Sequence, residues 1–161
     1  MLHASSFVDE LLKALQQHPF TSDLHIDHLA KLAHCCRFTR VYTDNYVFRE
    51  NQKADRFYLL QSGTVMLETE QQKSRTTSIQ TVGSGKLLGC SWVFEPHIWR
   101  FDARALSPTE MIEFDANKVR SLFAEDHELG FQLLRRVIKA TFERLESTRF
   151  QLLDLYDQDA K

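Results

Sequence analysis

The stretch from Gly83 to Glu113, GSGKLLGCSWVFEPHIWRFDARALSPTEMIE, constrains the fold of this chain more than any other segment. It opens on closely spaced glycines, passes through a short apolar run, turns at Pro96 and returns to the alternating pattern of a strand. This order predicts a strand, a tight turn, one or two helical turns beginning at Gly89, a loop and a second strand. The free N–H groups at the start of such a helix would favour an anion.

Aromatic and polar side chains are concentrated around this turn. Aromatic walls with a few convergent polar groups are the usual lining of a small-molecule pocket. Aromatic side chains are equally common as the filling of a β-roll core, and the periodicity alone leaves both interpretations open. The candidate ligand-binding residues of the segment are Gly89, Cys90, Ser91, Trp92, Trp99, Arg100, Phe101 and Asp102.

The length of 161 residues is that of one domain with a full hydrophobic core. The formal net charge of −2 provides no attraction to nucleic acid or to acidic membranes. No apolar run approaches the roughly 20 residues that a membrane-spanning helix needs. The N-terminal residues lack the basic and apolar regions of a signal peptide, so we expect a cytoplasmic protein.

The cysteines give no sign of disulfides or of a metal site. The chain has three, an odd number, and none in C-x-x-C spacing, which agrees with a reducing compartment. The one cluster of metal-ligand type lies along a single predicted helix, where the spacing places Cys36 on the buried face as a small apolar filler. That cluster is His25, His28, His34, Cys35 and Cys36. We therefore expect neither a metal nor a cofactor.

The chain divides into three parts of one structural domain. Residues 1–36 predict two short helices, the first capped by Ser5 or Ser6 and the second running from Thr21 or Ser22 to Cys36. Residues 37–115 contain short β-branched and aromatic runs separated by polar turns, which favours a β-roll or barrel. Residues 116–161 return to helical periodicity.

The last part predicts a short helix capped by Asp115 and a long helix capped by Asp126 that ends near Tyr156. A helix of about 30 residues spans about 45 Å, more than a small roll can cover. Apolar residues recur along it at alternating spacings of three and four, the pattern of a two-helix seam. We expect a homodimer through this seam, whose residues are Ile138, Thr141, Leu145, Thr148, Leu152 and Leu155.

Several motifs together resemble the cyclic nucleotide-binding domain of the catabolite activator and kinase regulatory-subunit type. They are YVFREN at 46–51, ADRFYLL at 54–60, SGTV at 62–65, the glycines at 85 and 89, Arg104-Ala105, and Arg144-Leu145 with Thr148. The resemblance implies an α+β, mainly β, fold: an eight-stranded antiparallel β-roll of jelly-roll type flanked by N-terminal helices and a long C-terminal helix. It makes residues 83–105 a phosphate-binding cassette and adds Thr148 to the ligand-binding candidates.

The residues that would bind a cyclic nucleotide do not match. The family's ribose-binding glutamate follows the cassette glycine, where this chain has Cys90, a poor acceptor. The phosphate-pairing arginine lies six residues before the alanine matching Ala105, which is Trp99. Arg100 is one place late, and a one-residue slip turns a strand side chain to the other face. Asp102 replaces the phosphate-binding hydroxyl, and a carboxylate there would repel a phosphate.

Two functions remain open from the sequence. The first is a regulatory sensor domain for a non-standard small ligand, with cyclic AMP and cyclic GMP binding at most weakly. The second is a ligand-free dimerising scaffold of the same fold. Catalysis is not expected, because no nucleophile–base pair is visible and His97 is the only histidine among the strands. No basic recognition helix follows the long helix, so we expect no binding to nucleic acid.

Overall fold

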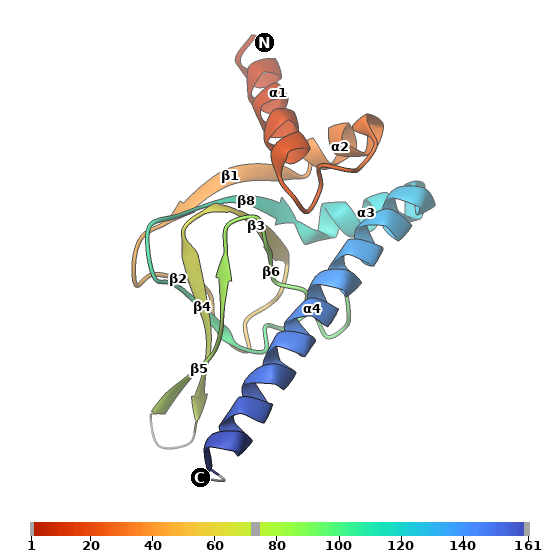
Figure 1. Cartoon of the computed structure of the whole chain (residues 1–161). Helices are drawn as coiled ribbons and strands as arrows, with labels where there is room; N and C mark the ends of the chain where they lie inside the picture. Colours follow the sequence, from red (N-terminus) through yellow and green to blue (C-terminus); the bar gives the residue numbers. More distant parts are fainter. Residues whose placement is uncertain (1, 72–74, 160–161) are drawn as a thin grey trace.

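A computed structural model describes residues 2–71 and 75–159. Within them, eight strands form two four-stranded antiparallel sheets that together make a β-roll (Figure 1). The strand orders are β1-β8-β3-β6 and β2-β7-β4-β5. The strands are β1 Cys36–Val41, β2 Tyr46–Phe48, β3 Arg56–Ser62, β4 Thr64–Gln71, β5 Arg75–Gly83, β6 Leu87–Leu88, β7 Asp102–Ala105 and β8 Thr109–Asp115. The predicted fold class is confirmed.

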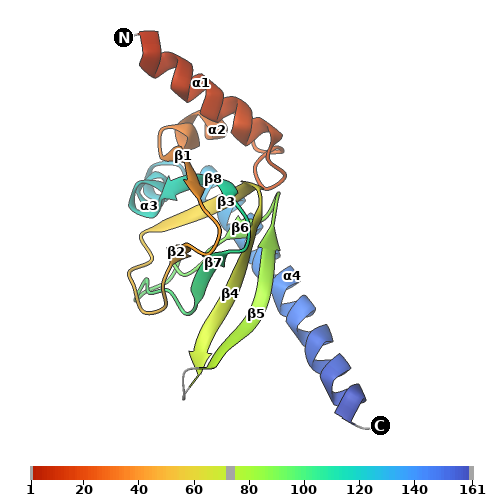
Figure 2. The ribbon, with the colours of Figure 1, turned by 90° about the vertical axis from the view of Figure 1, so that its left-hand side faces the viewer.

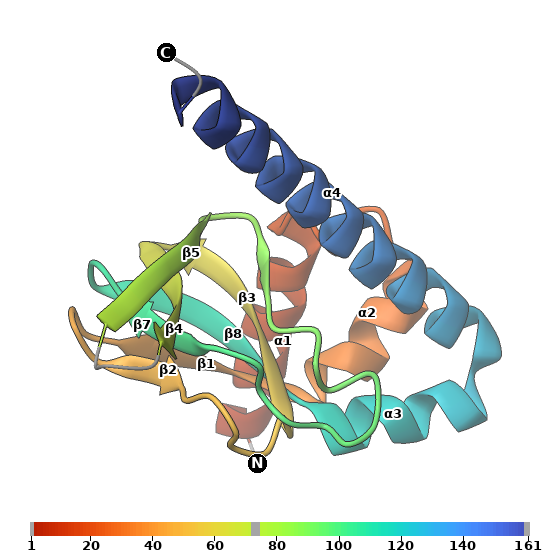
Figure 3. The same ribbon diagram turned by 90° about the horizontal axis from the view of Figure 1, so that it is seen from below.

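Four helices flank the roll in the described residues: α1 Leu2–Gln17, α2 Ile26–Ala33, α3 Ala116–Glu125 and α4 His127–Asp159. The first two lie together at one end of the roll (Figure 2). The long α4 begins beside α3, runs diagonally along the roll and extends past it, so that its C-terminal end stands clear of the sheets (Figure 3). No helix within the described ranges is long and apolar enough to cross a membrane.

Two hydrophobic clusters form the core, and β3 supplies both. Its alternating side chains face opposite sides of the sheet. Tyr58 and Leu60 enter the roll-interior cluster, whereas Phe57 and Leu59 enter the helix-side cluster, between the sheet and the helices. The roll-interior cluster consists of Phe48, Ala54, Tyr58, Leu60, Val65, Leu67, Val82, Leu88, Trp99, Ala103 and Met111. The largest buried members of the helix-side cluster are Leu11, Leu15, Leu29, Leu32, Phe57, Leu59, Trp92 and Phe114.

The N-terminal helices differ from the prediction at both boundaries. Because α1 begins at Leu2, Ser5 and Ser6 lie inside the helix and do not cap it. The second helix begins only at Ile26, where the His25 ring accepts a hydrogen bond from the backbone N–H of Asp27.

The hydroxyl of Thr21, which was expected to cap α2, donates instead to the carbonyl of Leu15 at 2.7 Å. It therefore stabilises the turn between α1 and α2. The same helix also ends earlier than expected, and Cys36 is the first residue of β1. Its thiol is half-buried against the helix-side cluster, and burial raises its pKa to about 12.

The predicted N-caps of the two C-terminal helices, α3 and α4, are confirmed. The Asp115 carboxylate accepts from the backbone N–H of Lys118 at 3.1 Å, and the Asp126 carboxylate accepts from that of Leu129 at 3.0 Å. Each satisfies one of the N–H groups that a helix start leaves without an intrahelical partner.

Candidate functional site

The cassette segment enters the roll interior through Trp99, whose side chain is 3% exposed. Its indole stacks on the ring of Phe48, with the ring centroids 3.7 Å apart and the planes 7° from parallel. A Cβ atom built on Gly89 would lie 2.6 Å from Cη2 of this indole. The indole therefore lies directly against the backbone of Gly89, which has a φ of +92° that also favours glycine.

Backbone hydrogen bonds hold Trp99 in this position. Its N–H donates to the carbonyl of Gln52, and its carbonyl accepts from the N–H of Asn51, both at 2.9 Å. Residues 97–99 thus pair with residues 51–54 as a short ladder beyond the end of β7. Because adjacent side chains in extended backbone point to opposite sides, Arg100 is exposed while Trp99 is buried.

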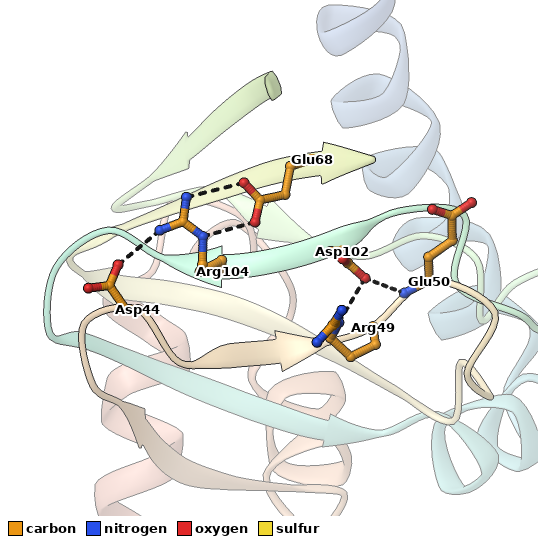
Figure 4. Close-up of polar contacts among 6 residues, drawn as sticks. All are labelled: Asp44, Arg49, Glu50, Glu68, Asp102 and Arg104. Atoms are coloured by element: carbon orange, nitrogen blue, oxygen red, sulfur yellow. Dashed lines mark hydrogen bonds and ion pairs between the residues drawn. The ribbon is translucent and has the colours of Figure 1, made fainter. Parts of the chain in front are cut away.

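Asp102 lies on the outer face of the sheet, not in the roll. Ala103 of β7 belongs to the roll-interior cluster, so its neighbours in the strand, Asp102 and Arg104, point the other way (Figure 4). The Asp102 carboxylate accepts from the backbone N–H of Glu50 at 2.7 Å and from Nε of Arg49 at 3.1 Å.

Asp102, at 8% exposed, is thus neutralised by a residue of the neighbouring chain segment. Its arginine partner is Arg49, on the segment that follows β2.

Arg104 extends the same polar surface. Its guanidinium donates two bonds to Glu68, at 2.9 and 3.2 Å, and a third to Asp44 at 2.9 Å. Hydrogen bonding to Glu68 raises the pKa of Arg104, so the arginine stays charged. Glu68 is 2% exposed, and a buried carboxylate without such a partner would be costly. We name Asp44, Arg49, Glu50, Glu68, Asp102 and Arg104 the outer-face cluster. Its bonds join β2, β7 and β4 and engage the carboxylates of Asp102 and Glu68 within the protein.

The helix expected after Gly89 does not form. The chain makes a single turn there, closed by the N–H of Val93 donating to the carbonyl of Cys90 at 3.2 Å. The expectation of an anion-binding helix start at Gly89 is therefore wrong. Cys90 and Ser91 are half-buried in this turn, and Cys90 packs against the helix-side cluster.

The two tryptophans lie in different cores and do not line one pocket. Trp92 is fully buried in the helix-side cluster, where its indole stacks on Phe57 with a centroid separation of 4.3 Å. Its carbonyl accepts from Arg120 of α3. Of the aromatic candidates, only Phe101 joins Trp99, as a half-buried neighbour of the roll-interior cluster. The structure thus brings Gly89, Trp99 and Phe101 together and separates them from Trp92.

Arg144 was missed as a site residue. From the middle of α4, its Nη2 donates to the carbonyl of Leu87 at 2.8 Å, two residues before Gly89. Burial lowers the pKa of this guanidinium. The hydroxyl of Thr148, a predicted ligand contact, donates to the carbonyl of Arg144 at 3.0 Å. The motif at 144–148 pointed to this part of the helix, but no local pattern reveals a bond to a carbonyl 57 residues away.

The predicted seam residues lie on the side of α4 that the roll leaves uncovered, with one exception. Ile138, Leu145, Leu152 and Leu155 are each at least half exposed, Thr141 is exposed, and Thr148 is half-buried. The first turns of the helix pack on the protein through Leu129, Leu133 and Val137. Further exposed apolar side chains of α4 are Phe131, Phe142, Phe150, Leu153 and Tyr156.

Comparisons with known proteins agree with this geometry. Residues 38–126 match the family model described as the cyclic nucleotide-binding domain. Over 113 residues, 27% are identical to the CRP-like cAMP-activated global transcriptional regulator of Mycobacterium tuberculosis. That alignment covers 70% of this chain and 49% of the relative, so the chain spans about half the length of the curated relatives it matches.

Solved structures show the same fold. A candidate cyclic nucleotide-binding protein from Geobacter metallireducens GS-15 is 26% identical with a TM-score of 0.75, covering 83% of this chain and 96% of that one. A domain from Methylobacillus flagellatus KT has a TM-score of 0.77 at 18% identity, over 94% and 85% of the two chains. The regulatory subunit of a cAMP-independent protein kinase A from Trypanosoma brucei has a TM-score of 0.73 at 16% identity, over 93% and 53%. The last two likenesses concern the fold alone.

Proposed function

Because this chain belongs to the cyclic nucleotide-binding domain family, we propose that it is a non-catalytic regulatory domain whose ligand site is closed by its own Trp99. The curated relative named above is a transcriptional regulator, which supports a regulatory role over a catalytic one. A cytoplasmic location is part of the proposal, by analogy with the transcriptional regulator named above.

The observation that carries the proposal is the indole of Trp99 against Gly89. The resemblance to the family places the arginine that pairs with the nucleotide phosphate at position 99, and the glycine at 89 borders the same site. Here an apolar ring fills that position, stacks on Phe48 and brings no charge. A cyclic nucleotide would have to displace a buried indole and would then meet no arginine at this position.

The geometry favours the scaffold over the sensor for a non-standard ligand. The sensor hypothesis needed Asp102 and Cys90 to receive a ligand with a donor or positive group, and Trp92 and Trp99 to stack on it. Asp102 is engaged with Arg49 and Glu50, Cys90 packs toward the helix-side cluster, and Trp92 is buried in that cluster. These positions support a domain that works through contacts with other proteins.

We propose that one of these contacts is a homodimer through α4. The helix presents apolar side chains that the roll does not cover, and its C-terminal part extends past the sheets (Figure 3). Exposed apolar stripes of this kind are typical of interaction surfaces.

Isothermal titration calorimetry with cyclic AMP and cyclic GMP tests the closed site. We expect binding no tighter than about millimolar, because each missing hydrogen-bonding partner costs about 1–3 kcal/mol. A variant that restores both family residues, Trp99→Arg with Cys90→Glu, should bind more tightly than the wild type. Micromolar binding by the wild type would contradict the proposal.

A further inference from the structure

A groove with a volume of about 690 Å³ runs along the first half of α4, separate from the roll interior. Its walls are α4, the turn between α1 and α2, and the turn between β5 and β6. None of the candidate residues of the cassette borders it. The groove is therefore distinct from the ligand site that the resemblance to the family implies.

The walls of this groove are held in place by contacts within the protein. Arg136 is 14% exposed at its side chain, and its guanidinium donates to Asp23 at 2.7 Å and to the carbonyl of Gln132 at 2.7 Å. The bond to Asp23 joins α4 to the α1–α2 turn. At the other end, a Cβ on Gly85 would come within 3.2 Å of Pro19, so the β5–β6 turn packs closely on the same segment. A partner would meet a preformed surface, which lowers the cost of binding.

The lining is cationic although the whole chain is acidic. Four cations, Lys86, Arg135, Arg136 and Lys139, face two carboxylates, Asp23 and Glu143, while the formal net charge of the chain is −2. Within the described residues, neither Arg135 nor Lys139 has a carboxylate within 4.0 Å. Lys86 reaches Glu143 only at 4.0 Å.

The groove also offers apolar contacts. Ile138 and Phe142 are 66% and 60% exposed, and Phe20 is half-buried beside them. Cations around apolar side chains suit a ligand that carries both carboxylates and apolar anchors. A segment of protein with acidic and apolar residues interleaved has this chemistry, and such segments commonly dock in a groove beside a helix.

We propose that this groove docks an acidic amphipathic segment of a partner protein. The proposal rests on the proposed function, because a domain with a closed ligand site needs a protein contact to pass on a signal. Nucleic acid fits the groove less well, since its phosphates would meet Asp23 and Glu143 and leave the apolar side chains unused. Ile138 is shared with the predicted dimer seam, but the remaining seam residues lie outside the groove, so a second copy of this chain fits that part of α4 better than the cationic groove.

Phage display with a library of random twelve-residue peptides, panned on the full chain, tests the class of partner. The enriched sequences should interleave Asp or Glu with large apolar residues. One such peptide is then synthesised with a fluorophore, and its affinity is measured by anisotropy. Reversing two charges, Arg135→Glu with Lys139→Glu, should weaken binding at least tenfold, about the value of two or more surface charge pairs.

Two further variants keep the test specific. Lys118→Glu makes the same kind of charge change on an exposed residue of α3 outside the groove and should leave the affinity within about twofold. Lys86→Glu repeats the reversal on the opposite wall without altering α4 and should weaken binding as well.

Enrichment of basic or uncharged peptides, or an affinity unchanged by both reversals, would overturn the proposal. So would loss of dimer mass in the Arg135→Glu, Lys139→Glu protein, because the groove would then be a subunit interface. Tight binding of cyclic AMP in calorimetry, by contrast, would refute the closed site and not the groove.

Discussion

Replacing Trp99 by alanine should cost about 3–5 kcal/mol of unfolding free energy. The side chain is 3% exposed, and large-to-small changes of buried aromatic residues fall in this range because they lose transfer free energy and leave a cavity. The parallel stack on Phe48 adds a contribution of about 0.5–1.5 kcal/mol that is part of the same total. Since domains are stable by about 5–15 kcal/mol, the variant should fold but be visibly weakened.

Urea unfolding followed by far-ultraviolet circular dichroism measures this loss without relying on tryptophan fluorescence. The wild type and variant should be compared at one protein concentration, because dimerisation shifts apparent stability. Trp99→Phe is the matched control: it keeps an aromatic ring against Phe48 and should lose clearly less.

The cavity left by Trp99→Ala should also accept the group that was removed. Engineered apolar cavities bind small apolar molecules. Free indole should therefore raise the melting temperature of Trp99→Ala and leave that of the wild type unchanged. A loss below about 1 kcal/mol, with no effect of indole, would show that the indole does not fill the site, and the closed-site proposal would fail.

Three other perturbations have defined outcomes. Asp102→Ala should lower stability by about 1–3 kcal/mol, because the N–H of Glu50 loses its buried acceptor; an unchanged melting temperature would contradict this role. Leu145→Asp with Leu152→Asp should give a monomer in sedimentation at tens of micromolar, and retention of a dimer mass would refute the seam. Burial lowers the pKa of His18 below 6.5, so the folded state binds fewer protons than the unfolded chain. Stability should therefore be full above about pH 6.5 and fall as the pH drops below it, a slope that urea unfolding would find reduced in His18→Gln.

Most of the fold could be predicted because its signals are local. The change from helical to strand periodicity at residue 37 and the two aspartate caps depend on neighbouring residues. Turn detail is harder to predict. Asn51 has a φ of 66°, whereas in the first hairpin Asp44 adopts a φ of 67° and the neighbouring Asn45 does not have a positive φ. Both residue types tolerate this conformation, so composition cannot decide which one takes it.

The candidate site was harder to predict, because its contacts join distant segments. Trp92 and Trp99 lie seven positions apart, yet one stacks on Phe57 and the other on Phe48, in different clusters. The spacing between two tryptophans carries no information about such partners. The same holds for Asp102, whose ionic partner Arg49 precedes it by 53 positions. The helix expected at Gly89 failed for a related reason, since burial of Trp92 and pairing of residues 97–99 with 51–54 fix an irregular path there.

The position of α4 bears on how a domain of this kind would signal. Trp99 occupies the interior side of Gly89, and Arg144 joins α4 to the carbonyl of Leu87 on the strand just before it. Both contacts are made by side chains of the protein itself, and that of Arg144 holds α4 against the roll. A ligand can shift an equilibrium only by binding two states differently, and an occupied site offers it little to bind. Regulation would then have to act from outside, on the exposed stripe of α4 or on the cationic groove beside it. Arg144→Ala separates the contact of Arg144 with Leu87 from that of Trp99 with Gly89. The variant should weaken the packing of α4 on the roll and lower the melting temperature, while the stack of Trp99 on Phe48 stays intact.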